Sequence, residues 1–201
     1  MPIEREIKIL GADFTALRRT LQALGAQCQG PRFERNELFD DARGSLRRAG
    51  RLLRLRRDGR NLLTWKEPAP KREGRGAKVL REIQTGVDDP GAVRGILAGL
   101  GLYQSLVYEK FRETWRLDGC EICLDWLPFG EFVELEGPAE SLESLPGRLG
   151  LDGLETSDAS YHALHARHRE AEGMPPADGF VFEEDRREAL AGELGVSLAE
   201  H

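Results

Sequence analysis

Ionic side chains recur at every second position in several short segments of this chain. Glu4, Glu6 and Lys8 follow this spacing near the N-terminus, and Arg54 and Arg56 follow it between leucines. Because successive side chains of a β-strand point to opposite faces, each such segment would carry its ions on one face. The ionic positions found in this way are Glu4, Glu6, Lys8, Arg54, Arg56, Lys66, Lys110, Arg112, Asp125, Glu134 and Glu136.

The chemistry of these side chains points to a ligand that carries both signs of charge. Carboxylates in Glu-x-Glu spacing supply hard oxygen atoms, which suit Mg²⁺ or Mn²⁺. Lysine and arginine on facing strands supply donors that match phosphate oxygens. If the apolar faces pack against helices, the ionic faces line an interior, and that interior is suited to a metal-bound polyphosphate.

Charge is unevenly distributed along the 201 residues, whose formal net charge is −6. Residues 43–81 hold fourteen Lys and Arg against three Asp and Glu, whereas residues 134–201 hold sixteen acidic residues against five basic ones. A basic block of this kind can bind nucleic acid. Many of its cations alternate toward the expected interior, however, so no nucleic-acid partner is expected.

The composition also bears on where the protein works. No apolar run approaches the roughly 18 residues of a membrane-spanning helix, and the N-terminus is charged where a signal peptide would be apolar. Three cysteines cannot form a disulfide framework. These features predict a cytoplasmic protein with no membrane partner.

Alternation and β-branched content predict eight strands, and two Asp-Gly pairs predict hairpins between neighbours. The strands are expected at residues 3–10, 37–40, 51–57, 61–67, 78–85, 106–117, 120–126 and 131–136. Helices are expected at residues 13–24, 89–100, 141–149, 158–170 and 183–194. This pattern predicts an α+β protein built on an eight-stranded antiparallel β-barrel with flanking helices, since closure removes the exposed edges of a sheet.

Several motifs occur in a characteristic order along the chain. They are Glu4-x-Glu6-x-Lys8, the segments 53–56, 64–66 and 124–136, Lys110-x-Arg112 and Ser160-Tyr161. Together they resemble the CYTH superfamily, the triphosphate tunnel metalloenzymes. The resemblance covers residues 1–171, which we expect to form the tunnel domain, and residues 172–201 are expected to form a linker and a short helical tail.

The resemblance implies roles for the ionic residues. Those implied to hold a divalent ion, Mg²⁺ or Mn²⁺, are Glu4, Glu6, Glu134 and Glu136, with Asp125 nearby. Those implied to bind the triphosphate are Lys8, Arg54, Arg56, Lys66, Lys110 and Arg112. Lys8, beside Glu4 and Glu6, is the candidate for orienting the attacking water in catalysis. One departure is Gln84, where many relatives carry a second acid after Glu82.

The function expected from this resemblance is hydrolysis of a triphosphate, either inorganic or organic, such as thiamine triphosphate or a nucleoside triphosphate. A class IV adenylyl cyclase, which converts ATP to cyclic AMP and diphosphate, is an alternative that shares nearly all of the same residues. A further alternative is a sensor that binds polyphosphate or nucleotide without turnover. In each case the partner would be a small-molecule triphosphate, bound by a monomer or a homodimer.

Overall fold

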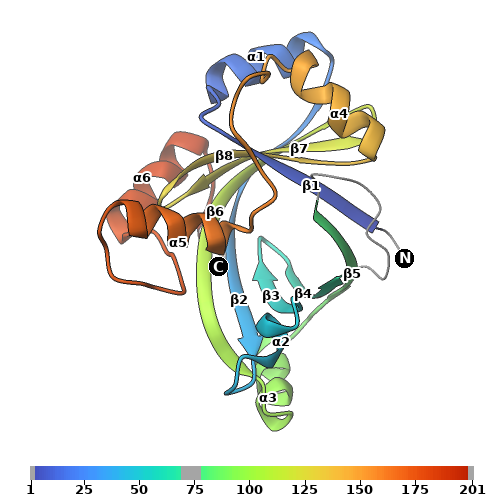
Figure 1. Cartoon of the computed structure of the whole chain (residues 1–201). Helices are drawn as coiled ribbons and strands as arrows, with labels where there is room; N and C mark the ends of the chain where they lie inside the picture. The colour runs from blue at the N-terminus through green and yellow to red at the C-terminus, as the bar shows by residue number, and fades with distance from the viewer. Residues whose placement is uncertain (1–2, 69–77, 199–201) are drawn as a thin grey trace.

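The computed structural model describes residues 3–68 and 78–198, without the side chains of residues 3, 4, 78 and 79. Within that part the chain forms nine strands and six helices (Figure 1). The strands are β1 (Ile3–Leu10), β2 (Gln27–Asp40), β3 (Leu52–Arg57), β4 (Asn61–Pro68), β5 (Lys78–Gly86), β6 (Tyr103–Leu117), β7 (Cys120–Leu127), β8 (Gly130–Glu136) and β9 (Thr156–Ser157). The helices are α1 (Phe14–Ala23), α2 (Ser45–Arg48), α3 (Pro90–Gly99), α4 (Ala139–Arg148), α5 (Tyr161–Ala171) and α6 (Glu184–Leu194). None of these helices is long and apolar enough to cross a bilayer.

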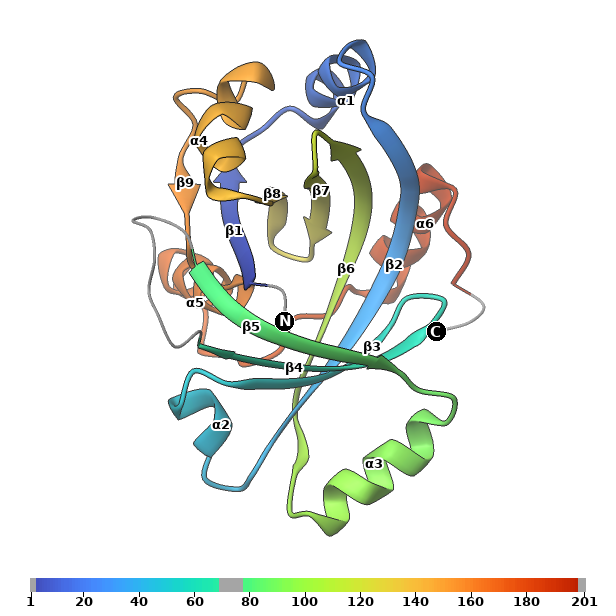
Figure 2. The same cartoon turned by 90° about the vertical axis from the view of Figure 1, so that its right-hand side faces the viewer.

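The strands form one antiparallel sheet that curls around a central space (Figure 2). Their hydrogen-bonded order is β5-β4-β3-β2-β6-β7-β8-β1-β9, and β5 pairs again with β1 through residues 3–6. The remainder of that edge of β1 pairs with the short strand β9. The predicted α+β fold with an antiparallel sheet and flanking helices is confirmed. The word barrel applies loosely, because the seam between β1 and β5 is only four residue pairs long.

The turns that join the strands follow from their sequences. β3 and β4 meet at Asp58-Gly59, and β6 and β7 meet at Asp118-Gly119, so both predicted hairpins are present. Asp118 and Gly119 have φ angles of 50° and 76°, a left-handed pair that fits a two-residue hairpin turn. Helix α1 begins where the Asp13 side chain accepts hydrogen bonds from two backbone N–H groups of its first turn.

The apolar faces of the strands point outward and are covered by helices. The largest buried cluster joins sheet residues such as Ile122, Val133 and Leu135 to side chains of α1, α4 and α6. Figure 1 shows where these helices lie relative to the sheet. Leu17 of α1 and Leu190 of α6 are each only 2% exposed. Because the apolar faces are buried under helices on the outside of the sheet, the opposite faces of the strands point into the enclosed space.

Strand β2 begins at Gln27, ten residues before the predicted start at Glu37. The sequence Gly30-Pro31 is typical of a turn, which is why the early part of this strand was not predicted. In the structure the chain stays in the sheet, and the pairing register shifts between Cys28 and Pro31. A bulge of this kind accommodates a proline, which cannot donate to the ladder.

Residues 179–182, which we call the C-terminal strap, lie along the part of β6 that β7 does not cover. The N–H of Phe180 donates to the carbonyl oxygen of Val107 (3.2 Å), and the N–H of Glu109 donates to the carbonyl oxygen of Phe180 (2.9 Å). Gly179 passes so close that an added Cβ would lie 2.5 Å from the Val107 oxygen. The approach therefore requires glycine, and it ties the tail to the sheet.

Candidate functional site

The curled sheet encloses a cavity of about 670 Å³. Nine of the described side chains that line it are basic and five are acidic. The basic ones are Lys8, Arg32, Arg54, Arg56, Arg60, Lys66, Lys110, Arg112 and Arg116. The acidic ones are Glu6, Glu82, Glu121, Glu134 and Glu136. Such a lining is suited to a highly charged ligand and not to an apolar one.

The two signs of charge occupy different halves of the cavity wall. We call β4, β3, β2 and β6 the basic half, because they and the β3–β4 hairpin carry every described lining cation except Lys8. We call β7, β8, β1 and β5 the acidic half, because they carry all five lining carboxylates. Each half is a run of hydrogen-bonded neighbours, so the separation of charge follows directly from strand order.

Two cations of the basic half are held by one buried carboxylate, Asp125. Arg112 donates to Asp125 through Nε (2.6 Å to Oδ1) and Nη2 (2.5 Å to Oδ2), and Lys110 donates to Oδ2 at 3.2 Å. Burial would lower the pKa of Arg112, but Asp125 opposes this and the net shift is upward. Asp125 is fully buried and does not line the cavity. Its oxygens therefore orient cations, although the resemblance placed Asp125 near the metal.

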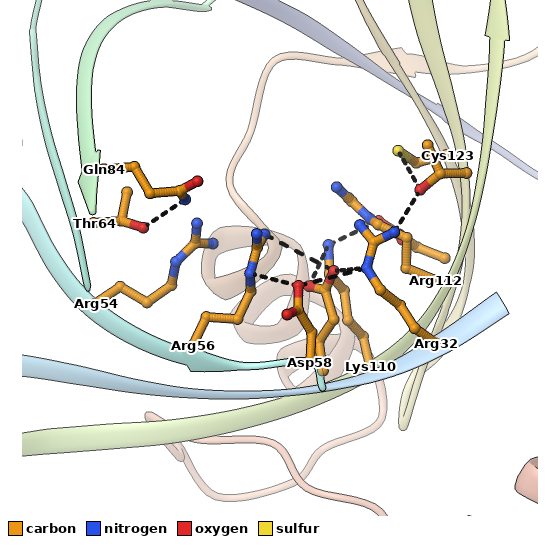
Figure 3. A network of polar contacts seen from close by, with 12 residues as sticks. Arg32, Arg54, Arg56, Asp58, Thr64, Gln84, Lys110, Arg112 and Cys123 are labelled. Atoms are coloured by element: carbon orange, nitrogen blue, oxygen red, sulfur yellow. Dashed lines mark hydrogen bonds and ion pairs between the residues drawn. The ribbon is translucent and has the colours of Figure 1, made fainter. Parts of the chain in front are cut away.

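Arg54 differs from its neighbours in the basic half in the partners of its charged group. Its Nη1 donates to the Tyr108 hydroxyl (3.2 Å), its Nε has no hydrogen-bond partner, and it forms no ion pair with a described carboxylate. By contrast, Arg56 lies 3.1 Å from Asp58 Oδ2 and Lys66 lies 2.7 Å from a carboxylate oxygen of Glu82. Figure 3 shows the Arg54 and Arg56 side chains pointing into the interior next to each other. Arg54 therefore keeps donor capacity for an anion.

Arg32 and Glu34 belong to this network and were not predicted, because the start of β2 was missed. Arg32 Nε donates to Glu34 Oε1 (3.0 Å), and Lys110 Nζ lies 3.7 Å from Glu34 Oε2. Burial would raise the pKa of Glu34, but Lys110, Arg56 and Arg112 lower it well below its usual value. The spacing Arg32-x-Glu34 is itself the alternation used elsewhere, and it could have revealed these residues.

Lys8 joins two carboxylates of the acidic half. Its Nζ lies 3.0 Å from Glu6 Oε1 and 3.3 Å from Glu134 Oε2, and the residue is only 2% exposed. Burial would lower the pKa of Lys8, but Glu134 and Glu6 outweigh burial and raise it. Lys8 therefore stays protonated at neutral pH. It can donate hydrogen bonds and contribute charge, but it cannot accept a proton.

Three carboxylates stand in a row across the acidic half. Glu136 on β8 is directly opposite both Glu6 on β1 and Glu121 on β7. Like charges at directly opposed positions repel, so this row favours a cation. The described side chains contain no group of three ligands converging on one point, and the side chain of Glu4 lies outside them. The donors fit Mg²⁺ or Mn²⁺ shared with phosphate oxygens, because Mg²⁺ commonly takes only one or two carboxylates from the protein.

The structure brings most of the predicted site residues into this one cavity. Those that line it are Glu6, Lys8, Arg54, Arg56, Lys66, Lys110, Arg112, Glu134 and Glu136. Asp125 is fully buried and does not line the cavity, and the side chain of Glu4 is outside the described part of the chain. The lining side chains that sequence reasoning did not assign to the site include Arg32, Arg60, Arg116, Glu121 and Tyr161.

Comparison with known proteins finds several relatives that are described as candidate adenylate cyclases. A candidate adenylate cyclase of Methanocaldococcus jannaschii is 28% identical over 136 residues, which are 67% of this chain and 76% of that protein. The solved structure of a candidate adenylate cyclase from Vibrio parahaemolyticus has a TM-score of 0.67 at 19% identity, over 81% of this chain and 97% of the other. A candidate adenylyl cyclase from Hippeastrum, described as having a dominant triphosphatase activity, has a TM-score of 0.61 at 19% identity, over 88% and 98%.

The two solved structures share the fold of this chain, with the same sheet and flanking helices. The family model of the CYTH domain matches residues 2–147, a span that includes β1 to β8. The match covers more than half of the chain and nearly all of the strands that line the cavity. This protein therefore belongs to the CYTH domain family.

Proposed function

We propose that this protein is a divalent-metal-dependent triphosphatase that hydrolyses an inorganic or organic triphosphate inside its cavity. The observation that carries the proposal is the division of one cavity wall into a basic half and an acidic half. A triphosphate complexed with Mg²⁺ or Mn²⁺ carries both of the charges that such a wall would bind. The triphosphatase activity described for the Hippeastrum protein of the same fold supports hydrolysis.

In this proposal the basic half binds the phosphate chain. Arg54 offers donors that no described carboxylate occupies, and Arg56 and Lys66 lie on the same and the neighbouring strand. Lys110 and Arg112 are already oriented by Asp125 before a ligand arrives. Donors fixed in advance stabilise developing charge without reorganising during the reaction, which is a large source of catalysis.

The acidic half would hold the divalent ion, through Glu6 and Glu136 together with Glu4. A divalent ion held by these residues would supply positive charge to the phosphate oxygens. The same carboxylates repel an anion that brings no metal. We therefore expect a triphosphate to bind tightly only when Mg²⁺ or Mn²⁺ is present.

Lys8 is placed to orient water or a terminal phosphoryl oxygen. An ammonium group has three N–H donors, and two of them face Glu6 and Glu134 at 3.0 and 3.3 Å. The third has no described hydrogen-bond acceptor, so a bound phosphate can accept from it. Because the raised pKa keeps Lys8 protonated, it would act by donating a hydrogen bond and by its charge.

Adenylyl cyclase activity is the second candidate, favoured by the names given to the Methanocaldococcus and Vibrio relatives. The same cations would bind the triphosphate of ATP. The 3′-oxygen of the ribose would then attack the α-phosphorus, the bond to the bridging oxygen would break, and diphosphate would leave. Both reactions need the same binding groups, so products must separate them.

A product assay tests the proposal. Purified protein is incubated with inorganic triphosphate, thiamine triphosphate or ATP, each with Mg²⁺, Mn²⁺ or EDTA, and phosphate, diphosphate and cyclic AMP are measured. We expect phosphate from at least one substrate, none of it in EDTA, and no cyclic AMP. Cyclic AMP and diphosphate from ATP would replace the proposal with the cyclase. Metal-dependent binding without any product would indicate a sensor.

A further inference from the structure

Tyr161, the first residue of α5, reaches from the helical layer to the cavity wall. Its hydroxyl donates a hydrogen bond to Asp125 Oδ2 at 2.6 Å, and the same carboxylate anchors Arg112 and Lys110. Burial and the neighbouring Asp125 raise the pKa of Tyr161 well above its usual value. The phenol therefore remains protonated and serves as a fixed donor within the network.

The ring of Tyr161 also contacts two lysines that line the cavity. Lys8 Nζ lies 4.9 Å and Lys110 Nζ lies 5.3 Å from the ring centroid. Ammonium groups within about 6 Å of an aromatic face are attracted by its quadrupole. Lys8 belongs to β1 in the acidic half and Lys110 to β6 in the basic half. One ring therefore contacts cations from both halves.

Packing around α5 fixes the place of this ring. Phe132 of β8 lies edge-on to Tyr161 with ring centroids 5.5 Å apart. Phe180 of the C-terminal strap belongs to the same buried cluster as Tyr161. The Ser160 side chain caps the helix by accepting a hydrogen bond from a backbone N–H of the first turn. The strap and the helix cap thus hold the ring against both lysines.

We propose that Tyr161 is a positioning residue that sets the places of the Lys8 and Lys110 ammonium groups for the bound triphosphate. The inference rests on the proposed function, since the lysines affect turnover only if the cavity binds a phosphate chain. An aromatic face attracts an ammonium group without neutralising it. Tyr161 therefore acts through the lysines.

Three variants test this role by kcat and KM with the triphosphate that the product assay identifies. Tyr161→Phe keeps the ring and should retain kcat within about threefold. Tyr161→Leu removes both ring contacts and should lower kcat by about tenfold or more, with a smaller change in KM. Leu164→Ala is the matched control in the same helix and cluster. It should lower the melting temperature and leave kcat unchanged at temperatures where all variants are folded.

A double-mutant cycle sharpens the test. In a Lys110→Met background, Tyr161→Leu should lower kcat by a smaller factor than in the wild-type chain, because one of the two partners is already gone. Wild-type kcat in Tyr161→Leu would overturn the inference. So would a loss of kcat of equal size in Leu164→Ala, because a destabilised core would then explain both.

Failure of the proposed function would be recognised separately. If the wild-type chain turns over no triphosphate, calorimetric titration with Mg²⁺ and inorganic triphosphate takes the place of kinetics. Tyr161→Leu should then weaken binding about tenfold, while Tyr161→Phe should bind as the wild type does. Unchanged binding in Tyr161→Leu, or no binding by the wild type, would overturn the inference.

Discussion

The basic and acidic halves of the cavity wall differ in which charges lie beside one another. Most described cations of the basic half have a carboxylate nearby, and buried Asp125 alone serves Arg112 and Lys110. In the acidic half, carboxylates face each other on neighbouring strands, as Glu136 does with Glu6. Lys8 is the one described lining cation among them.

This difference indicates which kind of ligand suits the cavity. The basic half carries eight described lining cations, and Arg54 among them has donor capacity that no described carboxylate takes up. The acidic half contains a row of like charges whose repulsion a cation relieves. A phosphate chain without a metal ion is attracted by the cations of the basic half and repelled by the carboxylates of the acidic half. A metal-bound phosphate chain satisfies both, so the comparison predicts that metal and substrate bind cooperatively.

The largest effect should come from removing one carboxylate of the row. Glu136→Gln is expected to lower kcat by about 100-fold or more and to raise the Mg²⁺ concentration needed for half-maximal activity, because the ion loses an anionic ligand. Turnover measured across a Mg²⁺ titration checks both effects. Glu131→Gln, whose exposed side chain lies on the opposite face of the same strand, is the matched control and should behave as the wild type. An unchanged Mg²⁺ requirement in Glu136→Gln would mean that this row does not hold the ion.

Substitution of two arginines of the basic half should have different effects on KM and on stability. Arg54→Met should raise KM by about 10-fold or more without lowering stability, because no described carboxylate is left unpaired. Arg112→Met should destabilise the fold by roughly 3–5 kcal/mol, because it strips the bidentate partner from buried Asp125. Urea unfolding beside steady-state kinetics separates the two effects. Equal destabilisation by both substitutions would contradict the different compensation of these residues.

These residues also show how far the sequence could predict the site. Arg54, Arg112 and Glu136 were predicted because period-two alternation assigns each strand residue to a face, whatever the rest of the fold does. Alternation assigns a residue to a face of the sheet but does not show how deeply its side chain is buried. It therefore could not show that Asp125 is fully buried and accepts a hydrogen bond from Arg112. Tyr161 approaches Asp125 from a helix 36 residues away in sequence, through packing that no local pattern encodes.

The same distinction applies to the fold. The hairpins at both Asp-Gly pairs were predicted because a left-handed turn has a short, local sequence signal. The early part of β2 was missed because Gly30-Pro31 locally favours a turn, whereas pairing with β6 holds the segment in the sheet through a bulge. The C-terminal strap carries no strand signal, and its place depends on the stretch of β6 that β7 leaves uncovered.

Acid titration should test whether buried carboxylates hold the basic half together. The pKa of Glu34 is lowered well below the usual 4.5, so its charge contributes stability above about pH 4.5. That contribution is lost as pH falls from there toward the lowered pKa. Wild-type stability should therefore fall more steeply with acid than that of Glu34→Gln, by up to about 1.4 kcal/mol per pH unit. Urea unfolding from pH 7 to pH 3 measures both slopes, and parallel curves would exclude this role for Glu34.

The smallest effect should follow from adding one more carboxylate to β5 of the acidic half, at Gln84. Gln84 lines the cavity and donates to Thr64 Oγ1 at 2.9 Å, two residues from Glu82 on the same face. Gln84→Glu loses that donor and adds a like charge, so without metal it should destabilise the fold by about 1 kcal/mol, or a few degrees of melting temperature. Gln84→Met removes the donor without adding charge and separates the two causes.

Metal should then reduce the difference between Gln84→Glu and Gln84→Met, because a divalent ion offsets the added charge. We expect the Mg²⁺ concentration for half-maximal activity to change by less than about threefold in Gln84→Glu, because Glu6 and Glu136 on β1 and β8 would carry the ion. Melting curves with and without Mg²⁺, beside the Mg²⁺ titration of turnover, measure both quantities. A tenfold gain in Mg²⁺ affinity would instead place the ion against β5, and the acidic half would then be organised around Glu82 and not around the row at Glu136.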